Sequence, residues 1–323
     1  MKNLLFTSVG RRGRFIKDVV ATLPDGMHVV ATDCSSLAPA LYFADKYYIV
    51  PKIDDDLYIP AILDICRKEH IGAIASLIDP EISLLASQKE IFAVYGVQVL
   101  SPDYLECQKC FDKFLTFQWL NQYAIPTIAT YETYDDFLKP YNSGKIDFPV
   151  FVKPRTGSGS VGARKVTALK ELEMLCSYEQ DLIIQEYISG IDISVDAYTD
   201  LISGKMVAMF SNRKLNMVIG GASKTVSFKS TELYDFIKNI AERLKLFGPV
   251  NFDIFYKDKK YLITEINPRF SGCYIHAHSL GVNFISLAIN NMSNIINQPR
   301  DYDYKDNMAM LMYDEIKIIS YNN

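Results

Sequence analysis

Short apolar runs alternate with amphipathic stretches over the first hundred residues of the chain. Each run is bounded by turn-forming residues and therefore predicts a buried strand. The runs span residues 2–8, 28–32, 47–50, 72–77 and 97–100. Apolar residues recur at helical spacing over 13–23 and 57–70, and Pro80 stands at an early position of a further helix. Strands that alternate with helices predict a parallel sheet covered by helices on both faces.

The pattern changes after residue 100. One long helix is predicted over 102–123, and longer strands then follow one another with few helices between them. The predicted strands span 148–153, 182–187, 192–198, 205–212, 251–256 and 261–267. The remaining predictions are helices over 169–177, 230–246 and 283–291 and a last strand within 309–319. This order is typical of a largely antiparallel α+β region, which would follow the α/β region.

Composition narrows the classes of partner. A net charge of −4 and the absence of a lysine- or arginine-rich run argue against nucleic acid, so small molecules are the expected partners. No apolar stretch approaches the ~20 residues of a membrane span, and the N-terminal run is too short for a signal peptide. We therefore expect a cytoplasmic protein whose six cysteines are free thiols. Cys107 and Cys110 have no second cysteine or histidine pair nearby, so zinc is not expected there.

A lysine and a glycine-rich loop form the first candidate for chemistry. Lys153 ends a predicted strand, and residues 156–162 read Thr-Gly-Ser-Gly-Ser-Val-Gly. Glycine lets backbone N–H groups converge on a phosphate, while the lysine supplies positive charge. Because the lysine precedes the glycines, the segment is not a Walker-type P-loop. A flexible surface hairpin is the alternative interpretation.

Two neighbouring strands carry the second candidate. Glu265 and Asn267 lie two residues apart in a predicted strand and therefore share a face. Asp253 in the preceding strand stands opposite Glu265 if a three-residue loop at 258–260 joins the strands, whereas a two-residue loop displaces it by one position. Facing carboxylates repel unless a cation lies between them, and Mg²⁺ prefers such oxygen ligands. The alternative is a polar sheet surface without a metal.

A third segment, residues 185–192, joins two predicted strands through Gly190. Such a crossing can offer backbone N–H and C=O groups to a purine edge and a carboxylate to ribose hydroxyls. A plain strand–turn–strand has the same pattern, so this segment does not by itself indicate nucleotide binding.

Together, these segments resemble the ATP-grasp superfamily, and in particular single-module relatives of the carbamoyl-phosphate synthase large chain such as amino-acid ligases. The resemblance implies a Rossmann-like pre-ATP-grasp α/β domain over residues 1–105, followed by an α+β ATP-grasp fold over 106–323. Residues 115–187 would form a lid subdomain within the second domain. ATP would lie between two α+β subdomains, with the glycine loop acting as a lid.

The resemblance assigns nucleotide-binding roles residue by residue. Lys113 and Lys153 match the two lysines that contact phosphate, and Asp192 stands where the family often has a ribose-binding glutamate. The other positions that match nucleotide contacts are Gly157, Ser158, Gly159, Ser160, Val161, Gly162, Glu186, Tyr187 and Ile188.

The resemblance also implies metal ligands and catalytic groups. Asp253, Glu265 and Asn267 match the magnesium ligands, and Asp253 departs most because relatives commonly have glutamate or glutamine there. Arg269 matches the arginine that steadies the transferred phosphate, and Lys153 would assist it. Arg213 is a weaker match for a second anion contact.

The implied activity is that of an ATP-dependent carboxylate–amine ligase, which forms an amide through an acyl phosphate and releases ADP and phosphate. It would need ATP with one or two Mg²⁺ or Mn²⁺ ions, and the carboxylate would be an amino acid or another small acid. One alternative is a nucleotide-binding module without turnover, and another is carboxyphosphate chemistry of the carbamoyl-phosphate type within a larger assembly. An oxidoreductase is not favoured, because the Gly-x-Gly-x-x-Gly fingerprint of dinucleotide sites is missing. Relatives of this kind often pair, so a homodimer is expected.

The acceptor substrate is expected to bind near Arg213 and the segments 220–224 and 271–273, on the side that faces the first domain. Two arginines at positions 11 and 12, in the turn after the first strand, could hold a substrate carboxylate. His276 and His278 could also contact substrate, although a structural role is the expectation for both.

Overall fold

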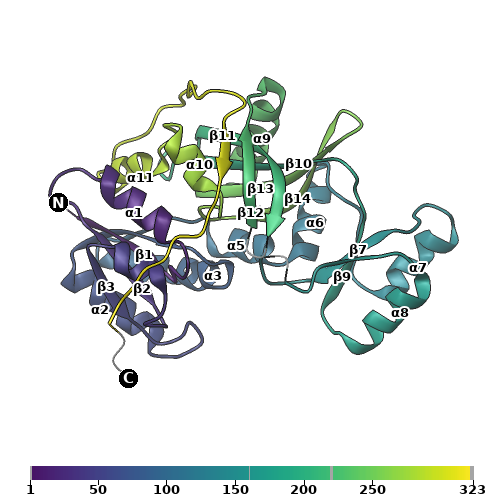
Figure 1. Cartoon of the computed structure of the whole chain (residues 1–323), viewed down its shortest axis with the longest axis horizontal. Helices are drawn as coiled ribbons and strands as arrows, with labels where there is room; N and C mark the ends of the chain where they lie inside the picture. Colours follow the sequence, from purple (N-terminus) through teal and green to yellow (C-terminus); the bar gives the residue numbers. More distant parts are fainter. Residues whose placement is uncertain (1, 160, 219–220, 321–323) are drawn as a thin grey trace.

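The computed structural model describes residues 2–159, 161–218 and 221–320 of the chain. The fold contains three sheets, the first parallel and the other two antiparallel (Figure 1). Among the described residues, no helix combines the length and the apolar character that crossing a membrane requires. The predicted fold class, an α/β domain followed by an antiparallel α+β region, is confirmed.

The first sheet is parallel and has the strand order β3-β2-β1-β4-β5. Its strands are β1 (Asn3–Thr7), β2 (Val29–Asp33), β3 (Lys46–Ile49), β4 (Ile71–Ser76) and β5 (Gln98–Val99). Leu4 and Phe6 face the core that contains α1 (Gly13–Thr22), whereas Leu5 faces the core that contains α2 (Tyr58–Lys68), as expected when side chains alternate along a strand. The other helices here are η1 (Pro39–Phe43), α3 (Asp79–Ser87) and α4 (Lys89–Val94). The strand order reverses between β1 and β4, and the carboxyl ends of such a strand pair border the usual ligand crevice.

The second sheet is antiparallel and has the order β14-β13-β10-β11-β12-β15. Its strands are β10 (Ile191–Thr199), β11 (Met206–Val218), β12 (Gly221–Ser227), β13 (Gly248–Lys257), β14 (Lys260–Asn267) and β15 (Ala309–Leu311). One face packs on α9 (Thr231–Arg243), where Val195 meets Ile237 in one core. At one end the opposite face packs on the N-terminal domain through Tyr198 and Phe210, and elsewhere it carries polar side chains.

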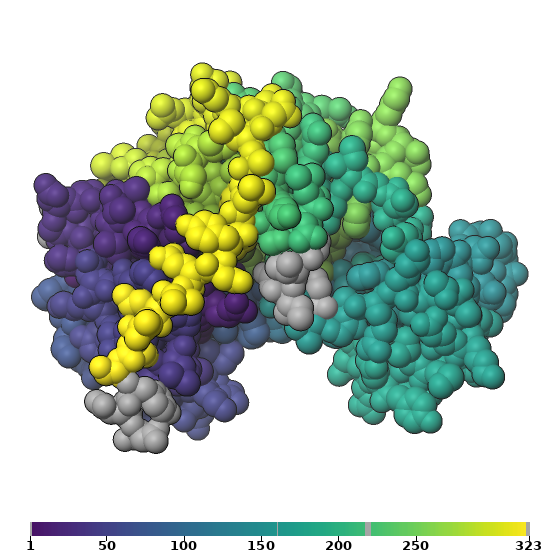
Figure 2. Space-filling model, in the orientation of Figure 1, coloured from purple at the N-terminus to yellow at the C-terminus, as the bar shows by residue number. Residues whose placement is uncertain are grey.

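The third sheet is small, with the order β6-β9-β7-β8. Its elements are β6 (Thr130–Tyr131), α7 (Tyr134–Asn142), β7 (Val150–Pro154), β8 (Arg164–Val166), α8 (Leu169–Tyr178) and β9 (Leu182–Glu186). A core of its own, which includes Phe137, Val152 and Leu172, holds them together. This unit, residues 130–186, is called the lobe below. It projects from the rest of the molecule (Figure 1), and Figure 2 shows a recess between the lobe and the remainder.

The prediction of a single helix over 102–123 is wrong, because the chain forms two helices there, α5 (Tyr104–Phe111) and α6 (Lys113–Gln122). Asp112 between them has an extended backbone, and its Oδ1 accepts hydrogen bonds from two N–H groups of α6 at 2.9 and 3.0 Å. An aspartate in this position caps a new helix. The break therefore places Lys113 at the start of α6.

The helices that follow β14 return to the N-terminal domain. α10 (Tyr274–Ser279) and α11 (Phe284–Met292) share one core with β1 and α1. The rings of Phe270 and Phe6 lie 6.1 Å apart, and those of Tyr274 and Phe15 lie 5.9 Å apart. One face of the parallel sheet is thus covered by helices from distant parts of the chain.

The C-terminal segment differs from the prediction. Only residues 309–311 of the expected strand pair with β12, and the chain then crosses the surface of the N-terminal domain (Figure 2). Lys17 on α1 lies 3.6 Å from Glu315, and Ile316 and Ile318 are exposed. Without a further strand to pair with, this apolar alternation does not extend the sheet.

Candidate active site

The polar face of the second sheet places the predicted metal ligands side by side. A two-residue turn joins β13 to β14, and its residues Asp258 and Lys259 have positive φ angles of 49° and 60°. That turn alone would leave Asp253 one position away from Glu265, but a β-bulge at Thr264 shifts the register and brings the two opposite each other. The sequence left the loop length open. The structure has the shorter loop and still pairs the two carboxylate residues.

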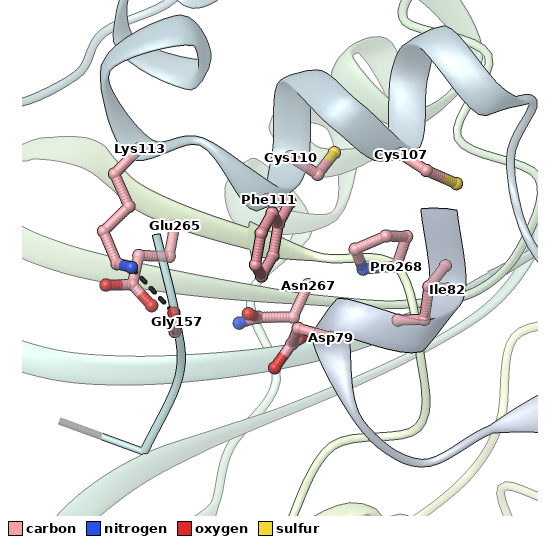
Figure 3. A pocket seen from close by; sticks show the side chains of 10 residues that line it. All are labelled: Asp79, Ile82, Cys107, Cys110, Phe111, Lys113, Gly157, Glu265, Asn267 and Pro268. Atoms are coloured by element: carbon pink, nitrogen blue, oxygen red, sulfur yellow. Dashed lines mark hydrogen bonds between the residues drawn. The ribbon is translucent and has the colours of Figure 1, made fainter. Parts of the chain in front are cut away.

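Both predicted phosphate-contacting lysines reach this face. Nζ of Lys153 donates to Oε1 of Glu265 at 2.7 Å. Nζ of Lys113 donates to the carbonyl oxygen of Gly157 at 2.8 Å (Figure 3). Both lysines are buried. Burial favours a higher pKa for Glu265, but Lys153 and Lys113 outweigh it and lower that pKa to about 2. Burial lowers the pKa of Lys113. The lobe therefore supplies Lys153 to a carboxylate of the second sheet.

A pocket lies beside this cluster (Figure 3). It is lined by Asp79, Ile82, Cys107, Cys110, Phe111, Lys113, Gly157, Glu265, Asn267 and Pro268. Nδ2 of Asn267 donates to Oδ2 of Asp253 at 3.2 Å. Within the described part of the chain, no group donates to Oδ1 of Asn267. An acceptor oxygen is thus available next to Glu265.

Arg269 is held in place by the N-terminal domain. Its Nε and Nη2 lie 2.8 and 2.9 Å from the two carboxylate oxygens of Asp79 at the start of α3. Burial lowers the pKa of Arg269, but Asp79 outweighs burial and the net shift is upward. Arg12, in the turn after β1, donates from Nη1 to the carbonyl oxygen of Phe270 at 2.7 Å. Burial and the neighbouring Arg269 lower the pKa of Arg12 to about 9. Two guanidinium groups therefore meet where the parallel sheet joins the second sheet.

The structure brings Lys214 to the site in place of Arg213. Nζ of Lys214 lies 2.5 Å from Oδ1 of Asp253 and 3.0 Å from Oδ1 of Asp192, so it links a predicted metal ligand to the predicted ribose ligand. Burial lowers the pKa of Lys214, but Asp253 and Asp192 reverse the shift and raise it. Arg213 points to the opposite face of β11, where it is exposed and stacks on Phe228 at 5.1 Å. The expectation that Arg213 contacts an anion in this site does not fit the structure, because adjacent residues of a strand face opposite ways.

The glycine loop lies on the lobe, and the predicted adenine segment, residues 186–188, begins at the last residue of the lobe. Gly157, Gly159 and Gly162 have positive φ angles of 96°, 72° and 74°, which only glycine adopts readily. The loop residues 157–159 and 161–162 are exposed, and Ser160 lies outside the described residues, as does position 220 of the predicted acceptor region. Ile188 is buried, Glu186 half-buried and Tyr187 exposed.

The two histidines have mainly structural contacts. Nδ1 of His276 lies 2.8 Å from Oγ1 of Thr225, and its ring packs on Phe210 at 4.9 Å. His278 packs on Tyr274 at 5.9 Å. Burial lowers both pKa values, that of His276 to about 4, so burial favours the neutral form of both imidazoles.

Comparison with known proteins identifies the class. Residues 110–273, half of the chain, match the ATP-grasp domain family, and residues 4–100 match the family described as PylC-like, N-terminal domain. The chain belongs to the ATP-grasp family, as the sequence predicted.

Individual relatives are more distant. The carbamoyl phosphate synthase large chain of Agathobacter rectalis is 26% identical over 243 residues, which cover 71% of this chain and 22% of that protein. The chain thus spans about a fifth of the length of that curated relative.

Solved structures show the same fold. The biotin carboxylase domain of the Hydrogenobacter thermophilus 2-oxoglutarate carboxylase, solved as a dimer with MgADP, ADP and bicarbonate, has a TM-score of 0.74 at 16% identity and covers 95% of this chain and 73% of that one. An L-amino acid ligase from Bacillus licheniformis has a TM-score of 0.69 at 15% identity and covers 95% and 78%. The N5-carboxyaminoimidazole ribonucleotide synthetase of Thermotoga maritima has a TM-score of 0.65 at 16% identity and covers 94% and 79%.

Proposed function

We propose that this chain is an ATP-dependent carboxylate–amine ligase that forms an amide through an acyl phosphate and releases ADP and phosphate. The observation that carries the proposal is that two buried lysines and a buried arginine gather at an acidic strand pair, beside a pocket that Lys113 and Glu265 line. Membership of the ATP-grasp family supports it. An L-amino acid ligase and a ribonucleotide synthetase share the fold, which also supports it.

Phosphoryl transfer depends mainly on positioning and on neutralising charge. Lys113 and Lys153 would hold the triphosphate, and the backbone N–H groups of residues 157–159 and 161–162 would close over it. A substrate carboxylate would attack the terminal phosphate, with Arg269 stabilising the charge that develops there. Burial of these groups strengthens their electrostatic contacts and keeps water from the intermediate.

The residues present fit a hard divalent cation. Asp253 and Glu265 face each other, and Asn267 on the same face has an available acceptor oxygen. Mg²⁺ uses few protein oxygens and completes its shell with phosphates and water. Bound Mg²⁺ or Mn²⁺, as one or two ions, would neutralise charge on the phosphate oxygens. Lys214 would hold Asp253 and Asp192 in place.

Three structural expectations accompany this proposal. The domain boundary near residue 105 and the lid role of residues 115–187 are tested by limited proteolysis with and without an ATP analogue. The homodimer is tested by sedimentation.

The test of the function is a turnover assay with MgATP and a mixture of the twenty common amino acids. We expect ADP and phosphate to appear only when the mixture is present, and hydroxylamine to trap the activated carboxylate as a hydroxamate. Release of AMP and pyrophosphate would reject the acyl-phosphate route. ATP binding without ADP release would instead support a nucleotide-binding module.

A further inference from the structure

Three buried polar side chains gather at one face of the second sheet, beyond the proposed metal ligands: two lie on its strands, and the third, on α10, packs against that face. Asp196, Asn212 and His276 are 1%, 0% and 3% exposed. Within residues 2–159, 161–218 and 221–320, no group bonds to Oδ2 of Asp196, to either amide atom of Asn212, or to Nε2 of His276. None of the three belongs to the nucleotide and metal cluster described above.

The register places them next to one another. Phe210 of β11 pairs with Asp196 of β10, and the ring of His276 packs on the ring of Phe210. Asn212 is two residues further along β11 on the same face, and it pairs with Ser194 on one side and Ser227 on the other. The hydroxyls of both serines have other partners, since Ser194 accepts from Asn251 and Ser227 donates to a backbone carbonyl.

Asp196 is connected to the proposed phosphate site through one residue. Nδ2 of Asn251 lies 3.3 Å from Oδ1 of Asp196, and Nδ2 of Asn267 lies 3.4 Å from Oδ1 of Asn251. The three residues occupy neighbouring strands, so Asp196 is two strand spacings, roughly 10 Å, from Asn267. One small substrate could therefore lie between the proposed site of phosphoryl transfer and Oδ2 of Asp196, the oxygen to which no described group bonds.

The charges that face Asp196 come from three elements. Arg269 follows β14, Asp253 lies on β13, and Arg12 comes from the turn after β1. Ser271 is a hydroxyl neighbour in the loop predicted to border the acceptor substrate. Burial is the largest influence and raises the pKa of Asp196 to about 7. A carboxyl group with that pKa can exchange a proton near neutral pH.

A structural role alone leaves these side chains unexplained. A buried polar group without a partner costs about 1–3 kcal/mol, and here a carboxyl oxygen and a complete amide lack partners within the described chain. An ammonium group has three donors and needs acceptor oxygens. Oδ2 of Asp196 and Oδ1 of Asn212 are such acceptors.

We propose that Asp196 holds the amine of the second substrate and accepts its proton before the amine attacks the acyl phosphate. The inference rests on the ligase reaction proposed above. One proton passes from the ammonium group to the Asp196 carboxylate, which leaves a neutral amine with a lone pair. The lone pair forms the new C–N bond, and the bond between the acyl carbon and the phosphate oxygen breaks, with its electron pair leaving on phosphate. A second nitrogen proton goes to the departing phosphate, and Asp196 later returns its own proton to water.

Hydroxylamine separates this step from the earlier ones, because it is largely unprotonated at neutral pH and needs no base. Wild-type protein and Asp196→Asn are compared with MgATP and the twenty-amino-acid mixture, with and without hydroxylamine. Asparagine keeps the volume and can still accept from Asn251. We expect amide formation in Asp196→Asn to fall by about 100-fold, the usual contribution of a general base, while hydroxamate formation is unchanged.

Asp200→Asn is the matched control, since Asp200 is a buried aspartate just beyond β10 and outside the site. It should leave the ratio of amide to hydroxamate unchanged. A second measurement needs no variant: with wild-type protein, amide formation should fall below about pH 7 relative to hydroxamate formation. Equal losses of both products in Asp196→Asn, or a ratio independent of pH, would overturn the inference. A wild-type protein that forms neither product would instead overturn the proposed function.

Discussion

The ion pair between Asp79 and Arg269 gives the most direct test of how the N-terminal domain supports the site. Both side chains are nearly buried, at 9% and 11% exposed, and two contacts of 2.8 and 2.9 Å join them. Replacing Asp79 with asparagine keeps the volume but leaves the buried guanidinium without its counter-charge. Breaking a buried pair in this way costs about 3–5 kcal/mol, and we expect the lower end because asparagine retains one acceptor oxygen.

Lys89 and Asp103 form the matched control. Their ion pair has the same 2.8 Å separation, but the side chains are 27% and 65% exposed. Asp103→Asn should therefore cost less than about 1 kcal/mol. The substitution and the shortest separation are the same in both pairs, whereas the exposure of the two side chains differs most.

The free energy of unfolding in urea is the measurement, followed by the fluorescence of Trp119, the single tryptophan, which is buried on α6. In a double-mutant cycle, Asp79→Asn with Arg269→Gln should cost about 2 kcal/mol less than the sum of the single changes. Turnover should fall as well, because Arg269 loses its fixed orientation. Equal effects of Asp79→Asn and Asp103→Asn, or strict additivity in the cycle, would refute the reasoning.

Two further predictions concern other parts of the sheet. Lys214→Met should weaken ATP binding by at least about tenfold in a calorimetric titration, because Asp192 and Asp253 lose their shared cation. The control Arg213→Met, at the neighbouring position, should leave ATP binding unchanged. An equal loss of affinity in both variants would contradict the assignment. Asp200→Asn should lower the free energy of unfolding by about 2 kcal/mol at neutral pH, because hydrogen bonds from Asn291 and Asn297 outweigh burial and lower the pKa of Asp200 to about 2. This contribution to stability is complete above the unfolded-state pKa near 3.8 and is lost as the pH falls toward 2. The free energies of unfolding of wild type and Asp200→Asn, measured in urea, should therefore converge between pH 3.8 and pH 2. A difference that does not shrink over this range would contradict the prediction.

Local patterns predicted much of this molecule. The alternation of apolar runs and helical spacing was sufficient for the parallel sheet, and the residue spacing in β14 put Glu265 and Asn267 on one face. The break at Asp112 could have been found in the same way, because aspartate is a common first residue before a helix. The bulge at Thr264 could not, since it depends on how two strands pair in three dimensions.

Long-range contacts account for what the sequence did not reveal. Arg213 and Lys214 are adjacent and both basic, so only the pairing of β11 with β10 decides which of them faces Asp192. Asp79 and Arg269 are separated by 190 positions, and no local sequence pattern around either residue indicates that they pair. Asp196 resembles any polar residue in a strand until its neighbours and its burial are known.

The aromatic rings that interlock beneath the parallel sheet have a consequence for engineering. Phe6 and Phe15 from the beginning of the chain pack on Phe270 and Tyr274, which follow directly after the acidic strand. A fragment that starts at residue 106 would expose Phe270 and Tyr274 to water and would also lack Asp79, the partner of Arg269. The first hundred residues therefore cannot be removed or exchanged for those of another protein without disrupting the core that they share with α10 and α11.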